Sequence, residues 1–432
     1  METQGKQLLI VGAGHAGSEL AVAARQSGWG GSITLLGDEP VLPYQRPPLS
    51  KAWLAGKVDA DGLLLRPRAV YEAAKVDLRT GVRMEAIDRA ERRIALSDGS
   101  LLAYDRLALC TGGRPRELAC TGLDPLRRPS NLHYLRTMAD AEGIRAQLRP
   151  GVRVLVIGGG YVGLEVAASA RGLGAQVTLL EAQPRVLARV AGAEVSRFYE
   201  DVHRRAGVDL RTGVQVESVE LSGGDIHAVR CSGGERIPAD LVVAGLGMLV
   251  NLEAARAAGL AEVDGIPVDE LSRTRDPNIV AAGDCTVQFS SLYGRELRLE
   301  SVPNALEQAR AAASWLGGKP RPHRAVPWFW SDQYDLKLQM VGLSQGHDRC
   351  VLRGDPATRS FCAFYLAGKR LLAVDAINRP ADFMVAKRAL AQPCLVDAAL
   401  LADPAVQLKD LLSPDSAAAQ GNPRTATAGA TP

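Results

Sequence analysis

The sequence predicts an α/β protein in which two Rossmann-like dinucleotide-binding domains are joined to a C-terminal α+β domain. Two Gly-rich loops of the GxGxxG form carry this prediction, because each follows an apolar strand and opens an Ala-rich helical stretch. A third observation is the change to an aromatic, strand-rich composition after Pro327. One such loop is weak evidence, but a pair of them indicates two bound dinucleotides.

The first domain begins with a strand at residues 7–11 and a loop at residues 12–17, a context in which backbone N–H groups hold a pyrophosphate. A second strand, at residues 32–36, leads to Asp38, about 20 residues beyond the first glycine. Asp38 is placed to accept hydrogen bonds from an adenosine ribose, or it is a solvated strand end. We expect His15 to point to solvent or to pack locally. The loop residues expected to serve the pyrophosphate are Gly12, Gly14, Ala16 and Gly17.

The chain then makes an excursion from the first sheet. We expect two strands, at residues 82–88 and 93–96, with a turn at Asp98-Gly99. A strand within residues 104–113, ending in two glycines, then returns the chain to the first sheet.

The second domain repeats this plan with a strand at residues 152–157 and the glycines Gly158, Gly160 and Gly163. Its second strand, at residues 176–180, ends at Glu181, which would bind a ribose and repel a 2′-phosphate, so NADH is favoured over NADPH. Arg189 tempers this preference, because an arginine can neutralise a phosphate or pack on an adenine. After a hairpin around residues 222–225, a strand at residues 241–247 ends at Gly247, where space is left for a nicotinamide.

Composition excludes several classes of protein. The chain has 432 residues, 47% hydrophobic and 23% charged, and its net charge of +3 is too small for a nucleic-acid binder as a whole. No apolar run approaches the length of about 18 residues that a membrane span needs, and the polar start leaves no room for a signal peptide, so we expect a cytoplasmic protein. The seven cysteines are scattered, so we expect reduced thiols and no metal site.

Four segments together resemble the ferredoxin reductases of bacterial oxygenase systems. They are residues 43–51 (PYQRPPLSK), 281–285 (AAGDC), 300–309 (ESVPNALEQA) and 328–334 (WFWSDQY). The similarity runs in order from about residue 5 to about residue 410, and only the tail departs from it.

The resemblance implies a glutathione-reductase-like arrangement, in which an NADH-binding domain is inserted into an FAD-binding domain. We expect residues 413–432, which lack periodicity, to be a disordered tail. The expected boundaries are 1–115 and 249–326 for the two segments of the FAD-binding domain, 116–248 for the NADH-binding domain and 327–412 for the C-terminal domain.

The activity implied by the resemblance is electron transfer. A non-covalently bound FAD would take a hydride from NADH and release single electrons to a small acidic [2Fe-2S] ferredoxin, which feeds a cytochrome P450 or a dioxygenase. A flavin suits this task because it accepts two electrons together and gives them up one at a time.

Further flavin-site residues are implied by the same resemblance. Met84 would give a backbone contact near the adenine, and Arg136 matches a flavin-binding arginine. Asp284 ends a strand at residues 278–284, where its carboxylate either accepts from the ribityl hydroxyls or caps the following turn. Val302 would present its N–H to the isoalloxazine, at the start of a helix whose positive end stabilises the reduced flavin.

Lys51 lies in a proline-flanked segment where the related disulfide reductases and NADH oxidases carry their redox cysteine. The first cysteine of this chain is Cys110, at the end of an expected buried strand, so we expect no thiol relay beside the flavin. The resemblance places Lys51 beside the flavin N5 and pairs it with Glu165. This pair either supports hydride acceptance electrostatically or is a purely structural ion pair.

Electron exit is expected near Trp330. Trp328 and Trp330 fall on one face of a strand and Phe329 on the other, a pattern that also fits plain core packing. An acidic partner requires basic residues around the exit, although a solvated face is the alternative for most of them. The candidates are Arg66, Arg68, Arg310, Lys337, Lys387 and Arg388.

Two other functions compete with this hypothesis. One is an NADH oxidase or disulfide reductase of the same fold, against which the missing flavin-side cysteine argues. The other is a redox-dependent interaction protein resembling apoptosis-inducing factor, in which turnover is incidental.

Overall fold

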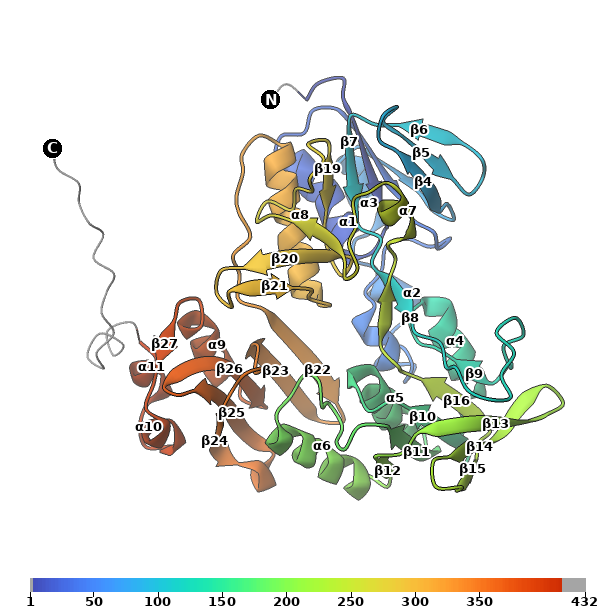
Figure 1. The fold of residues 1–432 in the computed structure, drawn as a ribbon, viewed down its shortest axis with the longest axis vertical. Coiled ribbons are helices and arrows are strands. Elements are labelled where there is room, and N and C mark those ends of the chain that lie inside the picture. Colours follow the sequence, from blue (N-terminus) through green and yellow to red (C-terminus); the bar gives the residue numbers. More distant parts are fainter. Residues whose placement is uncertain (1–2, 414–432) are drawn as a thin grey trace. The chain divides into compact units, whose positions relative to one another are not determined.

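The computed structural model describes residues 3–413 and divides them into two compact units, whose elements are labelled in Figure 1. Unit 1 contains residues 3–182 and 207–325, and unit 2 contains residues 183–206 and 326–413. Nearly all of the tail that we expect to be disordered, residues 414–432, lies outside the described residues.

Unit 1 contains two parallel five-stranded sheets built on one plan, and in each the strand before a Gly-rich loop is central. The central strands are nearly continuous apolar runs, as expected for parallel sheets covered on both faces. The first sheet has the order β19 (Ile279–Ala281), β7 (Arg106–Leu109), β1 (Gln7–Val11), β2 (Ser32–Leu36) and β3 (Val76–Arg79). The second has the order β12 (Asp209–Thr212), β11 (Gln176–Glu181), β10 (Arg153–Ile157), β16 (Leu241–Ala244) and β9 (Leu132–His133).

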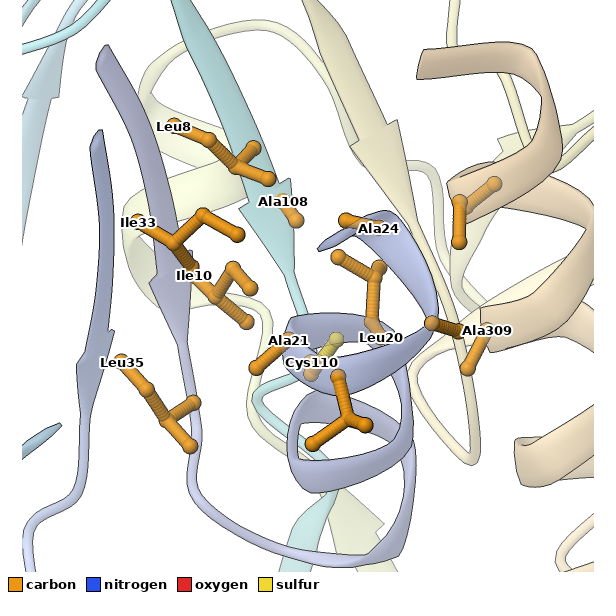
Figure 2. Close-up of a cluster of buried hydrophobic side chains, with 14 of the residues drawn as sticks. Leu8, Ile10, Leu20, Ala21, Ala24, Ile33, Leu35, Ala108, Cys110 and Ala309 are labelled. Atoms are coloured by element: carbon orange, nitrogen blue, oxygen red, sulfur yellow. The ribbon is translucent and has the colours of Figure 1, made fainter. Parts of the chain in front are cut away.

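Helices of unit 1 pack on these sheets. Figure 2 shows Leu8 and Ile10 of β1 and Ile33 of β2 facing Leu20 of α1, with Ala309 of α8 beyond it. The small alanines of α1 and α8 allow these two helices to approach closely, which places two helices over one face of the first sheet. The helices of unit 1 are α1 (His15–Gln26), η1 (Pro47–Ser50), α2 (Ala60–Leu63), α3 (Arg68–Ala73), α4 (Met138–Gln147), α5 (Tyr161–Gly172), α7 (Glu253–Ala257) and α8 (Val302–Leu316).

The excursion from the first sheet differs from the prediction of two strands. It has three, β4 (Met84–Asp88), β5 (Arg93–Leu96) and β6 (Leu101–Ala103), and the turn at Asp98-Gly99 joins β5 to β6. Gly99 has φ +81°, and the Asp98 carboxylate accepts the Ser100 N–H at 2.9 Å. The third strand escaped prediction because it is short and largely exposed.

The corresponding excursion in the second domain is also three-stranded. Its first two strands meet at the predicted hairpin around residues 222–225. The strands of this and the smaller sheets of unit 1 are β13 (Val216–Ser222), β14 (Asp225–Cys231), β15 (Arg236–Pro238), β8 (Gly113–Pro115) with β17 (Met248–Val250), and β18 (Ile266–Val268), β20 (Thr286–Ser290) and β21 (Arg295–Leu297).

Unit 2 is built on an antiparallel sheet that includes two strands the sequence did not predict, β24 and β27. The unit also contains α6, which comes from the middle of the chain. The Gly192 N–H before α6 donates to the Tyr365 hydroxyl at 3.0 Å, and His203 bonds Gln333 at 2.9 Å. The sheet has the order β22 (Trp328–Gln333), β23 (Leu336–Gly342), β26 (Arg370–Ile377), β25 (Ser360–Ala367) and β24 (Arg349–Asp355), with β27 (Cys394–Leu395) on β26. The helices are α6 (Ala193–Arg205), η2 (Pro356–Thr358), α9 (Pro380–Ala389), α10 (Ala398–Ala402) and α11 (Leu408–Leu411).

Two features are absent from the described part of the chain. None of its helices is long and apolar enough to cross a membrane. Among residues 3–413, no group of three or more His, Cys, Asp or Glu side chains is arranged to hold a metal ion.

Candidate functional site

The first Gly-rich loop leaves open space at its middle glycine. Gly12 has φ +103°, and a Cβ atom added there would lie 2.1 Å from the Cys110 carbonyl oxygen. A Cβ atom on Gly17 would lie 1.9 Å from the Gly12 carbonyl oxygen, whereas one on Gly14 would meet no atom within 4 Å. Gly14 is also the N-cap of α1, so the unpaired N–H groups of the first turn face this space. Ala16, in that turn, is buried. The arrangement fits a pyrophosphate.

The second loop repeats this geometry. Gly158 has φ +109°, and a Cβ atom there would lie 2.4 Å from the Gly245 carbonyl oxygen. A Cβ atom on Gly163 would lie 2.0 Å from the Gly158 carbonyl oxygen, and one on Gly160, the N-cap of α5, would meet nothing within 4 Å. The two loops therefore offer two similar anion-binding cradles.

The acids at the ends of the two second strands differ in their surroundings. Glu181 is half-buried, and its carboxylate accepts the N–H of Gly159 in the second loop at 2.6 Å. Asp38 is exposed. Its neighbour Glu39 accepts from the Arg46 guanidinium at 2.7 Å and from the Tyr44 hydroxyl at 2.6 Å.

A network of charges lies beside the first loop. Arg46 donates to the Arg136 carbonyl oxygen at 2.7 Å, and the Arg136 guanidinium lies 3.5 Å from the Asp284 carboxylate. Burial raises the pKa of Asp284, and Arg136 opposes that shift. Burial, and then Arg46, lower the pKa of Arg136. These residues come from three distant parts of the chain, so the fold assembles the cluster.

His15 faces this network. Burial, and then the positive charges of Arg46 and Arg136, together lower its pKa to about 4. His15 is therefore neutral at pH 7. Of the two expectations for His15, local packing fits its half-buried side chain.

The predicted pairing of Lys51 with Glu165 is confirmed. Lys51 Nζ lies 2.6 Å from Glu165 Oε2, and the two side chains are 18% and 5% exposed. Ser50 Oγ donates to the same carboxylate oxygen at 2.5 Å. Lys51 follows η1, and Glu165 lies in α5, which opens at the second Gly-rich loop. The pair therefore joins the proline-flanked segment to the helix of the second cradle.

Three further predicted cofactor residues lie at the ends of elements in unit 1. Met84 is the first residue of β4, and its side chain is buried. Val302 is the first residue of α8, where the Ser301 side chain caps the helix by accepting the Asn304 N–H at 3.3 Å. Gly247 is exposed, has φ +93° and connects β16 to β17.

Unit 2 contains further predicted site residues. Arg189 is exposed before α6. Trp330 is half-buried, and its ring centroid lies 5.7 Å from that of Trp328. The ammonium of Lys387 lies 4.3 Å from the Trp328 ring centroid, and Lys337 is exposed on β23. The three aromatic residues at positions 328–330 are all half-buried, and the Trp328 ring centroid lies 5.8 Å from that of the buried Phe383.

The two arginines proposed as partner contacts in unit 1 are already engaged with acids. Arg66 and Arg310 both bond the nearly buried Glu19 carboxylate, and the Arg310 distance is 2.7 Å. Arg310 also lies 3.2 Å from Glu307, yet half of its side chain is exposed. These contacts neutralise part of the positive charge that a partner would meet.

The cysteines offer no ready nucleophile. Cys110 and Cys285 are buried, and burial raises the pKa of both thiols. Cys285 directly follows Asp284, but its sulfur contacts the carbonyl oxygens of Leu109 and Ala282 at 3.6 Å. A thiolate at neutral pH is therefore disfavoured at both positions.

Sequence reasoning missed four polar residues of the site: Glu39, Tyr44, Arg46 and Ser50. All but Glu39 lie inside the segment that carried the resemblance, and Glu39 adjoins Asp38. Arg46 contacts Arg136 across 90 residues of chain, and Ser50 contacts Glu165 across 115, so no local pattern could reveal these two contacts.

Comparison with known proteins gives concordant matches. Residues 6–309 match the family model described as pyridine nucleotide-disulphide oxidoreductase, and residues 328–412 match the one described as reductase C-terminal. The putidaredoxin reductase of Pseudomonas putida is 50% identical over 94% of this chain and 96% of its own. The ferredoxin--NAD(+) reductase component of the anthranilate 1,2-dioxygenase system of Burkholderia cepacia is 41% identical over 94% of this chain and 98% of its own. The crystal structure of the covalent putidaredoxin reductase–putidaredoxin complex matches with a TM-score of 0.93 and 49% identity, covering 96% of this chain and 100% of that one.

Proposed function

The chain belongs to the pyridine nucleotide-disulphide oxidoreductase family, and from this membership we propose that it carries electrons from NADH through FAD to a [2Fe-2S] ferredoxin. It is an oxidoreductase of the ferredoxin reductase type, with FAD and NAD(P)H as its cofactors. The ferredoxin would supply a cytochrome P450 or a dioxygenase. A cytoplasmic location is also part of the proposal and rests on the composition of the sequence.

The first cradle is the proposed FAD site. The space at Gly14 and the network of Arg46, Arg136 and Asp284 support this assignment, because a dinucleotide that stays bound needs fixed partners for its anionic and hydroxyl groups. When bound, FAD supplies two-electron acceptance and one-electron release, which side chains cannot. The start of α8 at Val302 offers a positive helix end to the reduced flavin. Asp38 is proposed for the adenosine ribose and Met84 for a backbone contact.

The second cradle is the proposed NADH site. Gly158, Gly160 and Gly163 make the same space, and Glu181 is held by the loop that would carry the pyrophosphate. A carboxylate held there accepts from ribose hydroxyls and repels a 2′-phosphate, which favours NADH. Gly247, at the end of its strand, is proposed to leave room for the nicotinamide. Arg189 is proposed for the adenosine portion on its place in the sequence.

Lys51 is the proposed electrostatic partner of hydride transfer. Its ammonium is mostly buried and is balanced by Glu165, so the pair keeps one positive and one negative charge at a fixed place. The single observation that carries the proposed function is this link. It joins the helix of the NADH cradle to a segment where the related disulfide enzymes carry a redox cysteine and this chain has none.

Electron exit is assigned to Trp330 on the resemblance. Lys337 and Lys387 are proposed as contacts of an acidic ferredoxin. Lys337 is exposed on the strand that pairs with β22, and the Lys387 ammonium lies over the ring of Trp328, whose ring contacts that of Trp330. Arg66 and Arg310 are proposed as further contacts whose charge Glu19 partly offsets.

The test is steady-state turnover with NADH, NADPH and a [2Fe-2S] ferredoxin at low and high salt. We expect NADH to be preferred, and the ferredoxin KM to rise with salt because screening weakens the encounter. The charge reversals Lys337→Glu and Lys387→Glu should raise that KM by about 3- to 10-fold, leaving NADH reduction of the flavin unchanged.

Rapid NADH consumption with oxygen or a disulfide alone, indifferent to ferredoxin, would instead favour the oxidase alternative. A reduced flavin–NAD complex that lasts for minutes and passes electrons slowly to any ferredoxin would favour the redox interaction protein.

A further inference from the structure

Two serines add to the link between η1 and α5. Ser50, which is 4% exposed, donates its hydroxyl to Glu165 Oε2 at 2.5 Å. The half-buried Ser169 donates its hydroxyl to the Ser50 carbonyl oxygen at 2.7 Å. Together with the Lys51 ion pair, three polar contacts therefore join residues 50–51 to one helix.

The local structure explains why these residues meet. Glu165 and Ser169 are four residues apart in α5, so they share one face of the helix. Ser50 ends η1, and the Lys51 N–H closes that turn on the Pro48 carbonyl oxygen at 3.0 Å. Two consecutive residues of one segment thus contact an i, i+4 pair of the other.

The serines supply what the ion pair lacks. Lys51 ends a flexible side chain with a compact charge that accepts many directions, so attraction to Glu165 alone does not fix where the ammonium sits. Ser50 shares the same carboxylate oxygen and limits the orientation of Glu165. Ser169 fixes the backbone from which Lys51 extends, and Lys51 Nζ donates a further bond to the Pro47 carbonyl oxygen at 2.9 Å.

We propose that Ser50 and Ser169 are positioning residues for hydride transfer, which hold the Lys51 ammonium and the Glu165 carboxylate in one geometry relative to the NADH-binding helix. This inference rests on the proposed function of the two cradles. Neither serine belongs to a Gly-rich loop, so their removal changes the rate of hydride transfer and leaves NADH affinity nearly intact.

The experiment uses the full-length holoprotein and follows flavin reduction by NADH in anaerobic stopped flow over a range of NADH concentrations. For Ser50→Ala we expect the limiting rate constant of flavin reduction to fall about 3- to 10-fold. This factor is the free energy of one buried hydrogen bond converted to a ratio of rate constants. The Kd for NADH should stay within about twofold, and Ser169→Ala should give a smaller fall of about 2- to 3-fold. The matched control is Ser314→Ala in α8, a buried serine that bonds the Ala311 carbonyl oxygen and the Arg321 N–H and should leave both constants unchanged.

A double-mutant cycle separates positioning from general damage. In a Lys51→Met background, Ser50→Ala should slow reduction by less than about 1.5-fold, because its effect passes through Lys51. The proposal would be overturned if Ser50→Ala slowed reduction equally in both backgrounds or did not change the rate. It would also be overturned if the Kd for NADH changed by as large a factor as the rate. If Ser50→Ala does not fold, the same cycle with Ser169→Ala decides. Failure of NADH to reduce the wild-type flavin would refute the proposed function instead.

Discussion

The two Gly-rich loops of unit 1 share a backbone and differ in what surrounds them. In both, the first and third glycines pack against carbonyl oxygens and the middle glycine faces open space. Beside the first loop lie a neutral His15 and the interlocked Arg46 and Arg136, whereas the second loop is bonded by its own Glu181. We therefore propose that glycine spacing sets the kind of ligand, and that the neighbouring side chains determine whether this ligand stays bound or exchanges.

The largest effect should come from filling the tight glycine of either loop. Gly17→Val should yield protein almost free of flavin, because a Cβ atom there meets the Gly12 carbonyl oxygen at 1.9 Å. Gly163→Val, with the equivalent contact at 2.0 Å, should keep its flavin. Overpacking of this kind corresponds to a loss of about 10- to 100-fold in the affinity for the cradle's dinucleotide. The ratio of flavin to protein absorbance shows how much flavin each variant keeps.

The matched control is Gly172→Ala at the end of α5, where an added Cβ atom meets nothing within 4 Å. Loss of flavin from the Gly163 variant as well as the Gly17 variant would remove the distinction between the loops.

A second change tests the link between the two sites. Lys51→Met should slow reduction of the flavin by NADH by about 10- to 100-fold, because it removes a charge and leaves the buried Glu165 without its cation. Stopped-flow absorbance gives this rate. Lys57→Met, at an exposed lysine, serves as control. A Lys51 variant as fast as that control would mean that Lys51 and Glu165 form a purely structural ion pair.

A third change compares the two acids. Glu181→Ala should lower kcat/KM for NADH by about tenfold, the value of one hydrogen bond to a charged group. Asp38→Ala should lower the flavin content of the protein by a smaller factor than Glu181→Ala lowers kcat/KM, because Asp38 is exposed. Steady-state kinetics and flavin absorbance measure the two effects. A larger loss from Asp38 would reverse the roles that we assign to them.

The smallest effect concerns pH and the one histidine of the first loop. The pKa of His15 is about 4 in the folded protein and near 6.5 when unfolded, so only the unfolded chain takes up a proton between these values. The stability that a neutral His15 permits is complete above pH 6.5 and is lost as the pH falls towards 4.

For flavin-free protein we expect the folded state to be about 2 kcal/mol less stable at pH 5 than at pH 7 from this group alone. His15→Tyr, which copies Tyr161 of the second loop, should flatten the dependence of Tm on pH. His203 in unit 2, whose pKa is also lowered to about 4 by burial, titrates equally in both proteins and cancels in the difference. Identical pH profiles for the two proteins would contradict the assignment of a neutral His15 with a lowered pKa.

Local sequence patterns were enough to predict the two strand–glycine–helix units on which the parallel sheets are built. The strand–glycine–helix units needed only apolar runs and the spacing of Gly12 to Gly17 and Gly158 to Gly163, both short-range features. The strand β6 escaped because three largely exposed residues give no periodicity, and β24 was not predicted either.

The site was predictable only where a residue belonged to a motif. Lys51 and Glu165 were paired through the resemblance, and the structure bears that contact out. Arg46 lies in the same quoted segment, but its bond to the Arg136 carbonyl oxygen depends on a tertiary contact. The same holds for the low pKa of His15, since Arg46 and Arg136, which contribute to it, are distant in the sequence.

The most direct measurement of the central claim is a sequential anaerobic mix, first with NADH and then with oxidised [2Fe-2S] ferredoxin, on wild type and on flavin-loaded Gly163→Val. We predict that NADH bleaches the wild-type flavin after the first mix and that ferredoxin restores the flavin absorbance after the second. The Gly163 variant should resist NADH yet bleach with dithionite, because its flavin cradle is intact. A variant reduced by NADH as fast as wild type would contradict the assignment of the second loop to NADH. A wild-type flavin that ferredoxin does not reoxidise would contradict the proposed function.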